Sequence, residues 1–175
     1  MLNTEVNKVP SVRVQKAMKQ EAYFLTLTVY RWYYLFDRYN RWDILLESLK
    51  FCQANRELGI FHYVFMLNHI HLIVRSNDMA GFIRDFKTFT SKQLKKNIIE
   101  TEPHILKLFD VNGEYHFWQK TNMPEVVINE DFYLTKAKYI EDNPVRKKYV
   151  REAAHWVYSS ANKETNLLEL KSIFD

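Results

Sequence analysis

The sequence predicts an α+β domain with the ferredoxin-like (split βαβ) arrangement, in which helices cover one face of an antiparallel sheet and an additional helix follows near the C-terminus. Four short stretches are rich in β-branched and aromatic residues, and three longer ones repeat apolar residues at helical spacing. Their order is strand, helix, strand, strand, helix, strand and helix, which is typical of this fold. With 47% hydrophobic residues and only 3 Gly and 4 Pro, the composition excludes a disordered or low-complexity chain.

The first half of the chain contains three strands and one helix in this prediction. Residues 23–30 alternate large apolar side chains with Thr, which predicts the first strand. Residues 41–57 should form a helix that Gly59 ends, because apolar residues recur there every three to four positions. Residues 60–66 and 70–75 are two further apolar runs joined by a short connection, which indicates a hairpin.

The second half supplies the second helix, the fourth strand and the additional helix. Residues 79–97 combine an apolar stripe with a basic face, so we expect an amphipathic helix. The aromatic run at residues 115–118 predicts the fourth strand. Asn129 is a suitable N-cap for the last helix, and Pro144 should end that helix near Asn143.

Length and composition also bound the class of protein. The 175 residues predict a single domain at residues 21–162, between an N-terminal extension at 1–20 and a C-terminal tail at 163–175. The sequence contains no run of about 18 consecutive apolar residues, so we expect no membrane span. The single cysteine excludes an internal disulfide and a Cys-based zinc cluster, and no secretory signal is visible, so we expect a cytoplasmic protein.

Positive charge is concentrated in two places, although the net charge is only +4 with a pI near 9.0. One cluster sets five basic residues against one acidic residue, and the other sets six against two, so each has a net charge of +4. Such clusters suit a nucleic-acid partner, and they equally suit two solvated helix faces. Their basic members are Arg84, Lys87, Lys92, Lys95 and Lys96, and then Lys136, Lys138, Arg146, Lys147, Lys148 and Arg151.

Two histidines form a candidate metal site. His69 and His71 are one residue apart on a predicted strand, so both imidazoles point to the same face. Each can offer one ring nitrogen to a divalent cation. Taken alone, the pair also fits two histidines packed in a core or exposed on a surface.

A tyrosine in the last predicted helix is a candidate nucleophile. Tyr139 and Asn143 are one turn apart on the same helix face, and Lys136 lies one turn earlier. A phenol beside a metal-bound phosphodiester can attack phosphorus and form a phosphotyrosine, while an amide oxygen can complete the metal site. Since a phenol is mostly protonated at neutral pH, it needs a nearby cation such as a metal or a lysine. By composition alone, Tyr139 fits helix packing better than catalysis, and Asn143 fits an end cap.

Five segments together resemble one family, in the same order along residues 23–161. The chain is similar to the single-domain tyrosine HUH transposases of the IS200/IS605 type, known as Y1 transposases, and among them to the REP-associated tyrosine transposases. The segments are Met-Leu-Asn-His-Ile-His-Leu at 66–72, Phe-Lys-Thr-Phe-Thr-Ser at 86–91, Phe-Trp-Gln-Lys at 117–120, Tyr-Ile-Glu-Asp-Asn-Pro-Val-Arg at 139–146 and Trp-Val-Tyr-Ser-Ser-Ala at 156–161.

This resemblance implies a metal-dependent single-stranded DNA endonuclease and strand transferase that cuts near DNA hairpins. His69 and His71 match the family's metal motif, Tyr139 its catalytic tyrosine and Asn143 its third metal ligand, with Mg²⁺ or Mn²⁺ as the cofactor. The tyrosine would hold the 5′ end covalently. Basic side chains are then expected to contact DNA phosphates, namely Lys87, Lys92, Lys95, Lys96, Lys120, Lys136, Arg146 and Lys147.

The sequence departs from the family at three places outside these positions. Leu67 stands where REP-associated members usually have Pro, Lys120 replaces Arg, and residues 121–125 lack the usual Tyr-Asp-His. These differences concern the target sequence and local DNA contacts more than the chemistry.

Other interpretations stay open from the sequence. A histidine-triad nucleotide hydrolase would need a third histidine where this chain has Ile73. A non-catalytic module that binds hairpin DNA or RNA could use the same fold, with aromatic residues of the sheet stacking on bases. A transposase that has lost activity and only binds hairpins is a further alternative, and the sequence leaves a monomer and a homodimer equally open.

Overall fold

The computed structural model describes residues 21–122 and 124–173, so the expected N-terminal extension at 1–20 lies outside the described residues. The predicted fold class is confirmed. A four-stranded antiparallel sheet has the order β2-β3-β1-β6, and its strands are β1 (Ala22–Thr28), β2 (Gly59–Phe65), β3 (His69–Arg75) and β6 (Glu125–Val126). The two central strands, β3 and β1, are paired along their full length, which makes them the most rigid part of the sheet.

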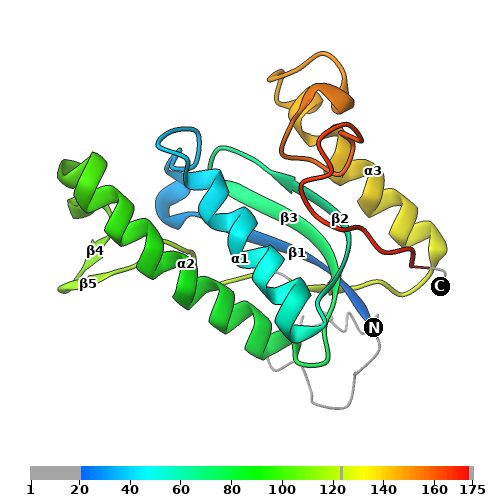
Figure 1. Cartoon of the computed structure of the whole chain (residues 1–175), viewed down its shortest axis with the longest axis horizontal. Coiled ribbons are helices and arrows are strands. Elements are labelled where there is room, and N and C mark those ends of the chain that lie inside the picture. Colours follow the sequence, from blue (N-terminus) through cyan, green and yellow to red (C-terminus); the bar gives the residue numbers. More distant parts are fainter. Residues whose placement is uncertain (1–20, 123, 174–175) are drawn as a thin grey trace, which may run out of the picture.

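Two helices lie side by side on one face of the sheet (Figure 1). They are α1 (Arg41–Arg56) and α2 (Met79–Thr101), and they cover the main hydrophobic core. The strands alternate their side chains between the two faces, so β3 gives Ile70, Leu72 and Val74 to this core. None of the described helices is both long and apolar enough to cross a membrane.

The additional helix, α3 (Glu130–Arg146), packs on the opposite face of the sheet. Its buried residues Tyr133, Ala137 and Ile140 contact side chains from the other set of alternating positions, including Phe24 and Ile73. Asn129 caps the helix as predicted, because its Oδ1 accepts a hydrogen bond from the backbone N–H of Phe132 at 2.8 Å. The sheet is therefore buried on both faces, and α3 and the sheet enclose a second, smaller core.

The predicted fourth strand at residues 115–118 is wrong. Glu114–Tyr115 (β5) pairs with Asp110–Val111 (β4) in a separate hairpin, and the strand that joins the sheet is β6. Phe117 and Trp118 are instead buried in the main core, where the Trp118 indole donates a hydrogen bond to the Thr90 hydroxyl at 2.9 Å. Burial of these large aromatic rings therefore decides the local backbone path more strongly than strand propensity.

An irregular segment still continues the sheet beyond β1. The carbonyl of Phe117 accepts a hydrogen bond from the N–H of Tyr30, and the N–H of Gln119 donates to the Thr28 carbonyl, both at 2.8 Å. We call residues 116–122 the edge segment, because they follow the outer side of β1 before β6 begins.

The prediction that Pro144 ends the last helix near Asn143 is wrong. The helix continues through Pro144 to Arg146. Proline has no backbone N–H, so the last turn lacks one hydrogen bond, but the residue keeps helical dihedral angles. The helix ends where Lys148 adopts a left-handed conformation with φ of 60° and donates to the Val145 carbonyl. Similarly, Glu57 with φ of 52° terminates α1 before Gly59 begins β2.

A buried arginine joins α1 to α2 and explains why α2 runs four residues beyond its predicted end at residue 97. The side chain of Arg41 is fully buried and donates to Asn97 Oδ1 at 2.8 Å and to Thr101 Oγ1 at 3.1 Å. It also forms an ion pair with Glu102 at 2.8 Å. Short 3₁₀ turns complete the described fold at Tyr30–Trp32, Pro103–Leu108 and Ala153–His155.

The C-terminal part of the chain covers the outer edge of β2. The N–H of Phe65 donates to the Tyr158 carbonyl, and the carbonyls of Tyr63 and Ile60 accept hydrogen bonds from the backbone of Ser160 and Lys171, all at 2.9 Å. Within the expected tail at 163–175, the backbone of Lys171 therefore pairs with β2, and Leu168 is buried in the main core.

We predict that Leu168→Ala lowers the free energy of unfolding by about 2–5 kcal/mol, because it removes a buried side chain and leaves a cavity. Leu170→Ala is the matched control, since Leu170 is 36% exposed and should change stability by about 0.5 kcal/mol or less. Urea unfolding followed by circular dichroism measures both. Equal effects would show that the tail does not anchor the core.

Candidate active site

The alternation of β3 places His69 and His71 on the face that α3 covers. Their neighbours Ile70 and Leu72 belong to the core on the opposite face. The two imidazole rings lie 4.8 Å apart between centroids and both are buried. Across the sheet, Thr28 of β1 pairs with His69 and Thr26 pairs with His71.

Asn68 determines which nitrogen of His69 carries the proton. Its Nδ2 donates to the backbone carbonyl of Trp32 at 2.8 Å, and because a carbonyl only accepts, this contact fixes the orientation of the amide. The Oδ1 atom then faces His69 Nδ1 at 2.8 Å, so Nδ1 must be the donor. His69 Nε2 is left with its lone pair, which is the form that binds a metal.

His71 is held by a hydroxyl and an aromatic ring. Thr26 Oγ1 lies 2.9 Å from His71 Nδ1, and the Phe24 ring stacks on the imidazole at 5.5 Å between centroids. Both histidines therefore have Nδ1 engaged by a neighbour. This common pattern leaves Nε2 of each ring as the remaining donor atom.

Burial keeps both imidazoles neutral at physiological pH. Desolvation, with a smaller contribution from the Lys147 charge, lowers the pKa of His69 to about 4. Desolvation also dominates at His71 and lowers its pKa to about 3, assisted by His69, Lys136 and Arg146. A neutral imidazole has the lone pair that a metal requires, so no proton must be displaced.

Tyr139 of α3 approaches this pair from the other side. Its ring lies 5.2 Å from the His71 ring and 6.0 Å from the Phe24 ring, in edge-to-face geometry in both cases. The Arg146 guanidinium lies over the tyrosine ring, 4.6 Å from its centroid. The candidate nucleophile therefore sits between a histidine and a cation, within a single chain.

Asn143 completes the group on the same face of α3. It is only 3% exposed, and its buried Oδ1 atom has no hydrogen-bond partner among the described residues. It lies one turn after Tyr139, which contacts His71, and one turn before Lys147, whose charge acts on His69. An unpaired buried amide oxygen is unfavourable unless something binds it, and a cation would do so.

The donor atoms fit a weakly held divalent cation. Within residues 21–122 and 124–173 no group of three or more His, Cys, Asp or Glu side chains could hold a metal. The candidate donors are two imidazole nitrogens and one amide oxygen, all neutral. Such a set leaves coordination positions for phosphate and water oxygens, unlike the closed tetrahedral site of structural zinc.

A second polar cluster clamps α3 onto β2. A bulge near Ile60 and His62 shifts the register of β2, and His62 faces α3. Its Nε2 lies 3.0 Å from the Tyr133 hydroxyl, and its Nδ1 lies 3.2 Å from a Glu141 carboxylate oxygen. The hydrogen bond with His62 lowers the pKa of Glu141. These contacts lie on either side of Tyr139 along the helix, so they orient it.

The structure brings only some of the predicted DNA contacts close to this site. Lys136 lies over the Phe24 ring at 4.3 Å and pairs with Glu125 at 2.8 Å, and Arg146 and Lys147 follow on the same helix. The remaining predicted contacts lie on α2 or the edge segment, separated from α3 by the sheet: Lys87, Lys92, Lys95, Lys96 and Lys120. The two basic clusters therefore do not form one surface around the histidines.

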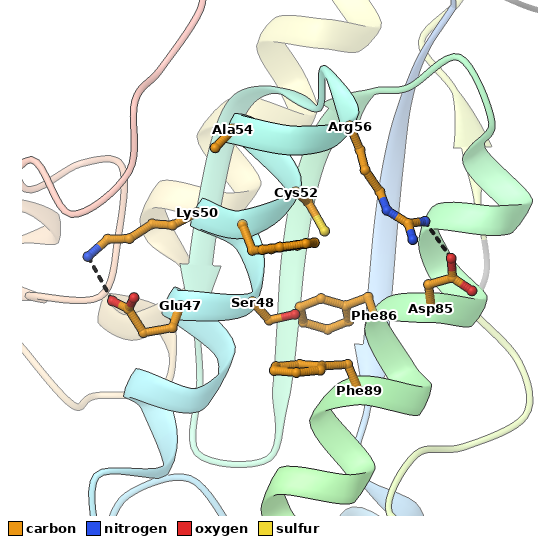
Figure 2. Close-up of a pocket in the computed structure, with 10 residues that line it drawn as sticks. Glu47, Ser48, Lys50, Cys52, Ala54, Arg56, Asp85, Phe86 and Phe89 are labelled. Atoms are coloured by element: carbon orange, nitrogen blue, oxygen red, sulfur yellow. Dashed lines mark hydrogen bonds and ion pairs between the residues drawn. The ribbon is translucent and has the colours of Figure 1, made fainter.

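An apolar groove lies between α1 and α2 (Figure 2), on the face of the sheet opposite to the histidines. Its volume is about 580 Å³, and it is lined by Phe51, Cys52, Phe86 and Phe89, with the Arg56–Asp85 and Lys50–Glu47 ion pairs at its borders. None of the site residues lines it. It plays no part in the site between β3 and α3.

Reasoning from the sequence did not assign roles to Thr26, Phe24, Asn68 or His62. Thr26 and Phe24 required the pairing of β1 with β3, which residue spacing alone does not reveal. His62 offered a usable signal, because it is a polar residue inside an otherwise apolar strand. Asn68 stood beside the histidine pair, but its function depends on the carbonyl of Trp32.

Comparison with known proteins supports the fold and leaves the family open. No family model and no curated protein matches the sequence. A solved structure of a REP-associated tyrosine transposase bound to a REP hairpin is similar, with a TM-score of 0.64 and 18% identity over 90% of each chain. At this identity the likeness establishes a shared fold.

We predict that the histidine pair makes stability depend on pH. Because folding holds both pKa values below the ordinary 6.5, the unfolded chain binds more protons in acid, and stability is lost as the pH falls below 6.5. His69 alone should remove about 3 kcal/mol from the free energy of unfolding by pH 4. Urea unfolding across this range should show a shallower slope for His71→Gln than for the wild type. Identical slopes would contradict the buried neutral state of His71.

Proposed function

We propose that the protein is a metal-dependent single-stranded DNA endonuclease and strand transferase, a tyrosine transposase that cuts near DNA hairpins. The observation that carries this proposal is the convergence of His69, His71 and Tyr139, with the unpaired buried oxygen of Asn143 one helical turn after Tyr139. Helix packing alone would not require two neutral histidines and an unpaired amide to meet a tyrosine.

The protein's own groups divide the work of metal binding. His69 Nε2, His71 Nε2 and Asn143 Oδ1 would hold Mg²⁺ or Mn²⁺, with Asn68 and Thr26 fixing the two imidazoles from behind. When bound, the cation polarises the phosphoryl oxygens of the substrate as a Lewis acid.

Tyr139 supplies the nucleophile in this proposal. Its Oη attacks phosphorus and loses the phenolic proton, the bond from phosphorus to the 3′ oxygen breaks, and the 3′ oxygen leaves as a hydroxyl after gaining a proton. The 5′ phosphate then remains on the tyrosine as a phosphodiester. Since one phosphodiester replaces another, attack by a new 3′ hydroxyl can reverse the step and join strands.

Basic residues on α3 would bring the phosphate to the tyrosine. Arg146 over the Tyr139 ring and Lys147 near His69 supply positive charge on the side where the phosphate must lie. All groups come from one chain, so we propose that the tyrosine acts on the site of its own subunit. A homodimer stays a prediction.

The fold supports DNA hairpins as the partner, because the similar solved structure is of a protein bound to a REP hairpin. The alternative of a module that stacks bases on its sheet is less favoured here. Both sheet faces are covered, one by α1 and α2 and the other by α3, so the described central strands offer no open aromatic platform.

We predict that Tyr139→Phe abolishes a covalent protein–DNA adduct. Labelled hairpin oligonucleotides would be incubated with Mn²⁺ and resolved on a denaturing gel, where the wild type gives a shifted band. Tyr39→Phe is the matched control, because it removes the same atom from an exposed tyrosine outside the site and should retain the band. If the wild type binds the hairpins of a panel but forms no adduct with any of them, the protein binds hairpins and the proposed cleavage chemistry is wrong.

We predict that Asn68→Leu weakens Mn²⁺ binding by about 10–100-fold, because it releases the His69 ring and its tautomer while leaving all three proposed ligands in place. The free Mn²⁺ signal in electron paramagnetic resonance measures binding without DNA. Asn55→Leu, an exposed change on α1, should have no effect. Unchanged affinity in Asn68→Leu, with the fold intact by circular dichroism, would exclude this orienting role.

A further inference from the structure

A cavity with polar and apolar walls lies between α2 and the edge segment. Its volume is about 670 Å³, enough for a phosphate with its attached sugar. Three of the lining residues are basic and none is acidic. Among the lining residues are Arg84, Lys87 and Ser91 from α2, and Gln119, Lys120 and Asn122 from the edge segment.

Lys87 carries a charge that the protein does not balance. Its Nζ donates to the Gln119 carbonyl at 2.6 Å, which uses one of its three N–H groups. Burial lowers the pKa of Lys87 to about 8. Arg84 is paired with Asp85 at 2.9 Å, whereas Lys87 and Lys120 form no ion pair within the described part of the chain.

A partly buried ammonium without a carboxylate is unfavourable unless a ligand supplies the negative charge. Lys87 has two donors left, and Lys120 beside it is exposed. Two free cations on one cavity suit the oxygens of a phosphate group, which accept several charge-assisted hydrogen bonds at once. An apolar or cationic ligand would leave both charges unpaired.

We propose that this cavity binds a backbone phosphate of the DNA strand whose scissile phosphate lies at Tyr139. The inference rests on the proposed function and adds a second contact point on the substrate, on the other side of the sheet edge. It also assigns unequal roles to the lysines of α2, because Lys92 and Lys96 do not line the cavity.

Strand pairing gives the backbone separation between the edge segment and β3. The N–H of Gln119 donates to Thr28, and Thr28 pairs with His69, so two strand spacings lie between the edge segment and His69. At about 4.8 Å each, the backbones are about 10 Å apart. The cavity lies on the α2 side of this edge and Tyr139 on the α3 side, so we propose that the strand passes around the edge segment between them.

The test compares Lys87→Met with Lys96→Met, which removes the same charge from the same helix outside the cavity. Binding of a fluorescein-labelled dT20 oligonucleotide is measured by anisotropy in EDTA over a range of NaCl concentrations. We expect Lys87→Met to weaken binding about 10-fold and to reduce the salt slope by about 0.7, the value for one lost contact to a single strand. Lys96→Met should weaken binding by about 2-fold at most, as a screened distant charge does.

Lys120→Met tests the same cavity with less risk of a folding defect than Lys87→Met. The Lys120 side chain is exposed and makes no hydrogen bond within the described residues. This substitution should lower the salt slope in the same way. Equal effects of Lys87→Met and Lys96→Met, in proteins with unchanged thermal unfolding, would overturn the proposal. The Tyr139 adduct assay reports on the proposed function separately, because a strand can be cut whether or not this cavity holds a phosphate.

A parallel titration with inorganic phosphate at matched ionic strength distinguishes a strand phosphate from the free ion. Only the oligonucleotide should discriminate between Lys87→Met and the wild type. If inorganic phosphate binds the wild type and not Lys87→Met but does not displace dT20, the cavity is a free-phosphate site and the assignment to DNA is wrong. A wild type that does not bind dT20 would overturn the proposal as well.

Discussion

The two-faced burial of β3 is the constraint on which the rest of the structure depends. A central strand covered on both sides must send alternate residues into two different cores. Ile70, Leu72 and Val74 enter the larger core under α1 and α2, so His69 and His71 must point to α3. A slip of one residue in the pairing with β1 would exchange these two sets, and the hydrophobic energy of the larger core prevents it.

This constraint also sets the electrostatics of the site. The layer between the sheet and α3 is dry enough to hold the pKa of both histidines far below the ordinary value, while Lys136, Arg146 and Lys147 surround it with positive charge. A neutral donor set in a basic environment binds a lone cation weakly. A phosphate would balance the charge, so cation and substrate would each favour the binding of the other.

The elements with a clear period were predictable from the sequence, and the elements shaped by distant contacts were not. The strands around His69 and the helix around Tyr139 carry strong local patterns, and the histidine pair and the tyrosine appear in the sequence as recognisable spacings. The aromatic run at residues 115–118 was misassigned because Phe117 and Trp118 fill space beneath α2. No pattern within residues 115–118 indicates that these two rings are needed in the core beneath α2.

Orienting contacts were also beyond prediction, for a related reason. Asn68 acts through a carbonyl 36 residues away and Thr26 through a histidine 45 residues away, so their roles exist only after the strands have paired. The extension of α3 through Pro144 is of the same kind, because the burial of that residue outweighs one lost hydrogen bond.

The cover on β2 has a consequence for how the chain is made. The three strands that hold the histidines leave the ribosome before residues 158–171, which pair with the outer edge of β2. Until that late segment arrives, the nascent sheet has an open edge able to pair with another chain. Correct folding of the sheet therefore depends on a segment made after its first three strands, and chaperones that shield the edge until then would raise the yield.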